Sequence, residues 1–187
     1  MANPKRFFNA EEQDEILHAI SEAESITSGE IRVHIDLRAG DDALFRAQEL
    51  FDELGMANTM QRNGVLLYLA VEDGKFVVLG DEGITDRVPD DFWDHIRDGV
   101  QESFHRGDFL DGVLYFIEEA GENLQEYFPH DAEDINELPD AISFGLADEG
   151  DEDESEEEID IDLPEDEDEE EYVPAEYEEE YEEAIDE

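Results

Sequence analysis

The chain has 187 residues, with 60 acidic and 10 basic side chains, and its formal net charge is -50 at pH 7. This charge excludes nucleic acid as a partner, because phosphate binding requires basic side chains, and it favours cations or basic proteins. The chain contains no cysteine, which excludes disulfides, thiolate zinc sites and cysteine nucleophiles. No apolar run is long enough for direct membrane insertion and no secretory leader is recognisable, so we expect a cytoplasmic protein. Adaptation to high salt is an alternative explanation of the acidity.

The first elements follow from capping and periodicity. Asn9 and Glu12 have the spacing of a capping box, which predicts that a helix begins there. Residues 30–37 alternate between polar and apolar side chains, so we expect a half-buried strand with His34 facing solvent. Helical spacing of apolar residues predicts a second helix over 41–54, ended by Gly55.

A second group of elements follows along the chain. Residues 65–70 are apolar on both sides, as in a central strand covered by two layers. Asp73 and Gly74 predict a two-residue type I′ turn, after which 76–79 returns antiparallel. Pro89 is expected to open a third helix, and apolar spacing predicts a fourth over 109–128. Residues 131–140 read as an irregular acidic segment.

The order of these elements predicts the fold class. A strand, a crossover helix and a second strand should pair in parallel, and the hairpin adds an antiparallel strand. We expect an α/β protein, a three-layer α/β/α sandwich with a small mixed sheet flanked by helices. The domain should span residues 1–146, and residues 147–187 should form a disordered acidic tail. The tail could be a solubility device, or it could recruit a basic or membrane-protein partner.

The predicted strand directions bring three distant segments to one edge of the sheet. Parallel strands begin at the same edge, and a hairpin returns the end of its second strand to the start of its first. Glu30, Asn63 and Asp81 should therefore meet there, with Arg62 and Glu82 beside them. Asp81 lies between Gly80 and Gly83, where an apolar strand ends and the backbone can turn sharply.

These side chains carry the oxygen donors that Ca²⁺ and Mg²⁺ prefer. The sequence therefore predicts a divalent-cation site, to which the later acidic segment could add ligands. Local turn and helix-capping roles for the same carboxylates stay open, and Arg62 can be either a counter-ion or a phosphate anchor. The candidate metal ligands are Glu30, Asn63, Asp81, Asp134, Glu137 and Asp140.

Several phrases of the sequence, in continuous order over roughly residues 5–142, resemble the TPM domain family. They are Thr27-Ser28-Gly29-Glu30-Ile31, Leu54-Gly55-Met56 with Thr59, Arg62-Asn63-Gly64-Val65-Leu66, Gly80-Asp81-Glu82-Gly83-Ile84, Phe92-Trp93 and Asn136-Glu137-Leu138-Pro139-Asp140. The resemblance implies a compact α/β/α sandwich, divalent-cation binding in an acidic cleft and, for some members, acid phosphatase activity. Many members are exported or membrane-anchored with glycine-rich tails, whereas this sequence resembles a stand-alone bacterial branch.

Two functions follow as hypotheses. The first is a Ca²⁺- or Mg²⁺-binding domain that could act as a metal-dependent acid phosphatase, with Asp81 and Glu82 as general base or acid. No sequence pattern indicates a covalent nucleophile, so hydrolysis would use a metal-activated water. The alternative is a non-catalytic scaffold or adaptor that recruits partners through its acidic tail.

Overall fold

The computed structural model describes residues 3–89, 91–130 and 137–146. Its centre is a four-stranded sheet in the order β3-β2-β1-β4, in which β1 is parallel to β2 and β4, and β3 is antiparallel to β2. The strands are β1 (Glu30–Asp36), β2 (Gly64–Ala70), β3 (Lys75–Gly80) and β4 (Ile142–Phe144). The helices are α1 (Ala10–Glu24), α2 (Ala43–Glu53), α3 (Glu82–Thr85), α4 (Phe92–His105) and α5 (Phe109–Tyr127), with 3-10 turns η1 (Pro4–Arg6) and η2 (Met56–Asn58).

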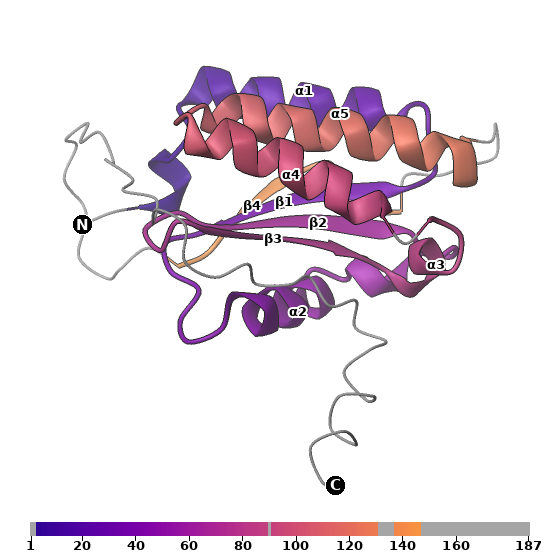
Figure 1. Ribbon diagram of the computed structural model, residues 1–187, viewed down its shortest axis with the longest axis horizontal. Coiled ribbons are helices and arrows are strands. Elements are labelled where there is room, and N and C mark those ends of the chain that lie inside the picture. The colour runs from indigo at the N-terminus through magenta and orange to yellow at the C-terminus, as the bar shows by residue number, and fades with distance from the viewer. Residues whose placement is uncertain (1–2, 90, 131–136, 147–187) are drawn as a thin grey trace, which may run out of the picture.

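The helices cover both faces of the sheet. Figure 1 shows α1, α4 and α5 on one face and α2 on the other, and the predicted three-layer α/β/α fold is confirmed. Strand β2 is buried along its whole length because both layers pack on it. Its side chains alternate between two apolar cores, so that Val65 and Leu67 pack toward α1, α4 and α5, while Leu66 and Tyr68 pack toward α2.

The prediction that one side of β1 faces solvent is wrong. All seven residues of this strand are buried, and His34 is only 3% exposed. The reason is β4, which pairs with β1 in register from Val33 to Ile35 and closes the edge that the sequence left open. Polar side chains on this side of β1 bond to one another and to the segment around β4, as described below.

Two local predictions also need correction. Ala70 pairs with Lys75, so four residues connect β2 to β3, and only Gly74 of them has a positive φ, 61°; the turn is therefore not a two-residue type I′ turn. Pro89 does not open a helix, because α4 begins at Phe92 and the short helix α3 precedes it.

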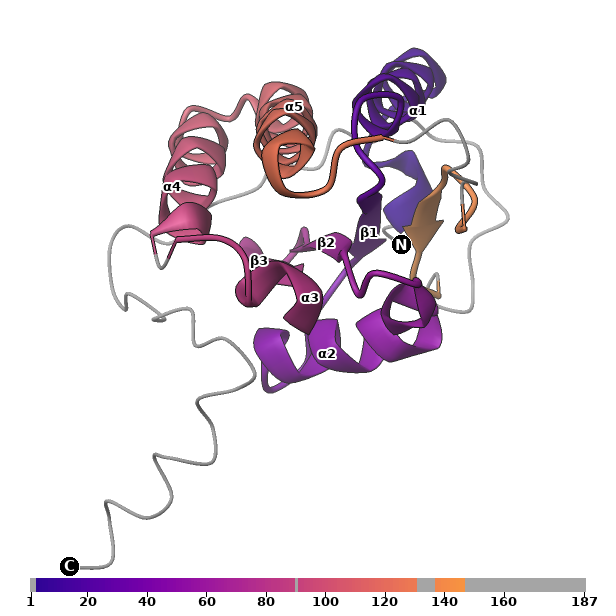
Figure 2. The same cartoon turned by 90° about the vertical axis from the view of Figure 1, so that its right-hand side faces the viewer.

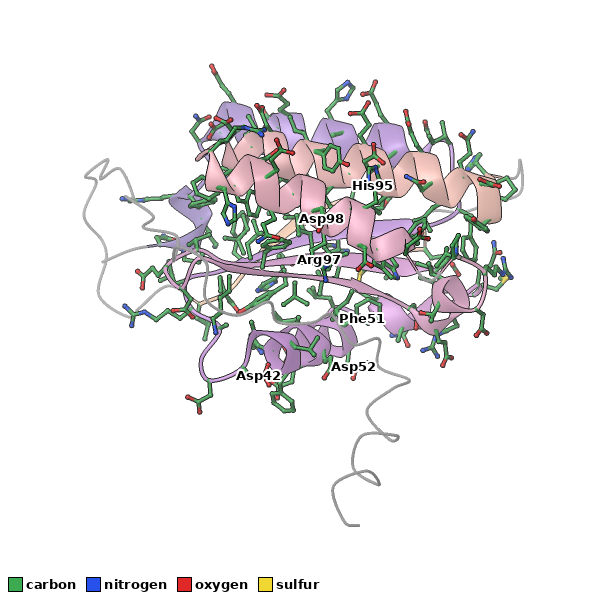
Figure 3. The ribbon with its side chains drawn as sticks, in the orientation of Figure 1. Asp42, Phe51, Asp52, His95, Arg97 and Asp98 are labelled. Carbon is green, nitrogen blue, oxygen red and sulfur yellow. The ribbon has the colours of Figure 1, made fainter. Side chains whose placement is uncertain are left out.

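Helix capping agrees with the sequence. The Asn9 side chain accepts from the backbone N–H of Glu12, whose carboxylate accepts from the Asn9 N–H, so the capping box is present. The Asp42 side chain caps α2 by accepting from the N–H groups of Leu44 and Phe45, and Figure 3 shows Asp42 at the beginning of that helix. Among the described residues, no helix is both long enough and apolar enough to span a membrane.

Candidate functional site

The three strand ends meet at one edge of the sheet, as predicted. Glu30 is the register partner of Gly64, and its N–H donates to the Asn63 carbonyl oxygen at 3.3 Å. On the other side of β2, the Asp81 N–H donates to the Gly64 carbonyl oxygen at 2.9 Å. Figure 2 turns this edge toward the viewer, with α3 next to the end of β3. The sheet therefore holds Glu30, Asn63 and Asp81 together through backbone hydrogen bonds.

Glu30 and Asp81 stand on either side of Gly64, which has no side chain. Because the two residues are two strand spacings apart, their α-carbons are separated by about 10 Å. Each carboxylate bonds to groups on its own side. Among the described residues, the two carboxylates share no hydrogen-bond partner, and the edge carries two groups of charged side chains.

The first group, the Asp81 group, consists of Arg62, Asp81 and Glu82. Arg62 binds Asp81 through two hydrogen bonds, from Nε to Oδ2 at 2.7 Å and from Nη2 to Oδ1 at 2.8 Å. The Asp81 carboxylate also caps α3, since Oδ1 accepts from the Glu82 N–H at 2.8 Å. Arg62 is thus a counter-ion here, one of the two roles left open by the sequence, and its bond to Asp81 raises the pKa of the guanidinium.

The second group, the Glu30 group, consists of Glu24, Glu30, Arg32, Glu137 and Asp140. The Glu30 carboxylate accepts from the backbone N–H of Glu137 at 2.8 Å and of Leu138 at 3.2 Å. The Glu137 carboxylate in turn accepts from the Met60 N–H at 3.0 and 3.1 Å. These bonds fasten residues 137–138 across the starts of β1 and β2.

Acidic side chains outnumber basic ones in the Glu30 group. Burial is the main cause that raises the pKa of Glu24 to about 9, with a hydrogen bond from the Ile31 N–H opposing it and Asp140 adding to it. Burial likewise raises the pKa of Glu30. Arg32 is the basic residue of the group, and its Nη2 donates to the Pro139 carbonyl oxygen at 2.8 Å. Desolvated carboxylates of this kind favour either a proton or a bound cation.

Asn63 supplies an oxygen atom with no partner among the described residues. Its Nδ2 donates to the Ser28 carbonyl oxygen at 2.9 Å, but its Oδ1 is buried and accepts no hydrogen bond from the part of the chain that the structure describes. The residue is 1% exposed and lies at the start of β2, between the strands that carry Glu30 and Asp81. A buried acceptor without a donor is costly, so it is a fitting ligand for a cation.

The donors at this edge have the chemistry of a Ca²⁺ or Mg²⁺ site, because all of them are oxygen atoms. Within residues 3–89, 91–130 and 137–146, however, no three His, Asp or Glu side chains are grouped closely enough to hold a metal ion. Carboxylates, the Asn63 amide and backbone carbonyls would have to act together. Of the predicted ligands, Asp134 lies outside the described residues, and Glu137 and Asp140 lie on the Glu30 side.

A separate polar network on β1 was not anticipated from the sequence. His34 bonds through Nδ1 to Ser143 Oγ at 2.8 Å and through Nε2 to Asp36 Oδ1 at 3.2 Å. Asp36 also accepts a hydrogen bond from Tyr68 and pairs with Arg46. Burial alone would raise the pKa of Asp36, but His34, Arg46 and Tyr68 together hold this pKa below its usual value. Because His34 is buried and Asp36 accepts from three donors, we interpret this hydrogen-bond network as a structural link between β4 and β1.

The sequence matches the family model described as the TPM domain over residues 2–123. The NMR structure of the BA42 protein from the psychrophilic bacterium Bizionia argentinensis is 50% identical, has a TM-score of 0.71, and is matched over 74% of this chain and 96% of that chain. The N-terminal domain of cg2496 from Corynebacterium glutamicum is 17% identical, with a TM-score of 0.50 and coverage of 62% and 73%, and supports the fold alone. No curated protein matches the sequence.

Proposed function

Because the chain belongs to the TPM domain family, we propose that it binds a divalent cation, Ca²⁺ or Mg²⁺, at the edge where β1 and β2 begin and β3 ends. The observation that carries this proposal is the buried Oδ1 of Asn63, which has no partner among the described residues and lies between Glu30 at the start of β1 and Asp81 at the end of β3. It is a hard oxygen donor held in place by the fold, with carboxylates on both sides. Glu137 and Asp140 would supply further negative charge.

Backbone carbonyl groups can complete the coordination. A Cβ added to Gly64 would lie 2.6 Å from the Met56 carbonyl oxygen, so that oxygen lies against the strand between Glu30 and Asp81. Calcium sites commonly combine carboxylates with carbonyl oxygens and water, and such a mixed set does not need three grouped carboxylates.

The test is a titration of the full chain with Ca²⁺ or Mg²⁺, followed by amide chemical shifts. We expect saturable shifts at residues 29–30, 63–64 and 81–82. Asp81→Asn should raise the dissociation constant of the ion at least tenfold, because one ligand loses its charge. Asp111→Asn, a control at an exposed position on α5, should leave the dissociation constant unchanged. Shifts confined to the acidic residues 147–187 would reject the site.

Phosphomonoester hydrolysis is a second proposal, favoured by one observation. The Arg62 side chain is 43% exposed and the Glu82 side chain 58% exposed, beside the proposed cation site. A guanidinium matches the geometry of a phosphate group, and an exposed carboxylate can transfer a proton to or from a water molecule. A bound cation would polarise the phosphoryl oxygens.

This second proposal predicts hydrolysis of an aryl phosphate in the presence of Mg²⁺. Asp81→Asn and Glu82→Gln should each reduce kcat by about 100-fold, in line with the loss of a general acid or base. Turnover that is equal in the wild type and in both variants would mean that another protein in the preparation is responsible. Recruitment of a basic or membrane-protein partner by residues 147–187 stays a proposal, because those residues lie outside the described structure.

A further inference from the structure

Arg62 has an unusual backbone for its residue type. Its φ is 51°, and among the described residues it is the only residue other than glycine with a positive φ. This left-handed conformation costs free energy for a residue with a Cβ, so it persists only where surrounding contacts hold it. The Arg62 N–H donates to the Thr59 carbonyl oxygen at 3.3 Å, and its side chain pairs with Asp81, whose carboxylate is nearly buried while the guanidinium is partly exposed.

The guanidinium occupies the place that a cation would take at Asp81. Both Asp81 oxygens are bonded to it, at 2.7 and 2.8 Å, so a divalent ion has to compete with the guanidinium for this carboxylate. We propose that Arg62 is the built-in cation of this carboxylate, and that a divalent ion binds Asp81 by displacing it. The inference rests on the proposed cation-binding function and adds the residue that controls its affinity.

The surroundings of Arg62 allow such an exchange. Its Nη1 is already 3.3 Å from Glu82, an exposed carboxylate, so the displaced guanidinium keeps a partner at the surface. Asp81 in turn keeps its bond from the Glu82 N–H and remains fixed at the start of α3. The exchange therefore moves one flexible side chain and leaves the backbone of the strand ends in place.

Oxygen atoms that could join Asp81 as ligands of the incoming ion are close to the same loop. A Cβ added to Gly83 would lie 2.2 Å from the Gln61 carbonyl oxygen and 2.6 Å from that of Arg62. These two carbonyl groups therefore pack against the first turn of α3, directly after Asp81. Together with the Asp81 carboxylate they are donors of the type that Ca²⁺ selects.

The exchange makes a quantitative prediction for Arg62→Gln, which removes the competing charge. A charge-assisted, bidentate pair has to be broken for the ion to enter the wild type, so the variant should bind Ca²⁺ about tenfold more tightly. Arg62→Gly should have the same effect, and it tests the inference without backbone strain because glycine accepts a positive φ. Arg38→Gln is the matched control, since Arg38 is exposed and pairs with Glu72 elsewhere.

The measurement is Ca²⁺ titration of the full chain by NMR, with the Nε–H resonance of Arg62 as a direct reporter. We expect this resonance to move with the amides of residues 80–82, while that of Arg46, which pairs with Asp36, stays unchanged. If these amides shift, the Arg62 resonance does not, and the Arg62 variants bind as the wild type does, the exchange is overturned and the cation site stands. If no amide of residues 80–82 responds in any variant, both proposals fail.

Discussion

Gly83→Ala is expected to lower the free energy of unfolding by about 3 kcal/mol, the upper part of the range for an overpacked position. The new methyl group would meet two backbone carbonyl oxygens, those of Gln61 and Arg62, at 2.2 and 2.6 Å. Neither can move as a flexible side chain would. Alanine favours a helix over glycine by only about 1 kcal/mol, which does not offset the clash.

The same substitution should disturb the site, because the displaced carbonyl groups belong to the loop that carries Arg62. Chemical denaturation gives the stability, and amide shifts of residues 61–63 report the loop. Gly107→Ala is the control: Gly107 has a φ of 81° but no atom within 4 Å of an added Cβ, so only backbone strain of about 1 kcal/mol is expected. Equal losses in both variants would contradict the close packing at Gly83.

Glu24→Gln is expected to stabilise the protein by about 1–3 kcal/mol at pH 7 when no divalent cation is present. The pKa of Glu24 is about 9 in the folded protein, compared with 4.5 for an unperturbed glutamate. Between these values the folded state keeps a proton that the unfolded state has released, so the wild type loses stability as the pH rises from 4.5 toward 9. Glutamine does not titrate, yet it still offers an oxygen to the Ile31 N–H.

The stability gap between wild type and Glu24→Gln should therefore widen from pH 5 to pH 8 and vanish below about pH 4.5. Urea unfolding at several pH values, with EDTA present, measures it. Glu22→Gln is the control, since Glu22 lies on the same helix with a largely exposed side chain. Parallel pH profiles for the wild type and Glu24→Gln would show that the Glu24 carboxyl is not protonated in the fold.

Much of the fold could be predicted because its signals are local. The capping box of α1, the apolar spacing of α2 and the apolar run of β2 all indicate elements that the structure contains. Strand β4 was missed because three residues carry too little periodicity, although Ile142, Ser143 and Phe144 do alternate. Its absence from the prediction is what made His34 look exposed.

The sequence could predict where the candidate site lies but not which partners each of its carboxylates has. Strand directions correctly brought Glu30 and Asp81 to one edge, because topology alone determines which strand ends meet. The partners of each carboxylate depend on side-chain geometry, which spacing does not encode. Glu24 was missed for the same reason: it ends a helix among other acidic residues, and only the packing of α1 against β1 makes it distinctive.

Strand β4 and the residues before it have a consequence for how the protein is made. Every layer of the sandwich is present by Tyr127, the end of α5. Glu30 and His34, however, bond to Glu137, Leu138 and Ser143, which leave the ribosome later. A nascent chain that has emerged only to α5 would lack these partners, and His34 would keep only its bond to Asp36. The polar side of β1 therefore cannot be completed until this short segment has followed α5 out of the ribosome.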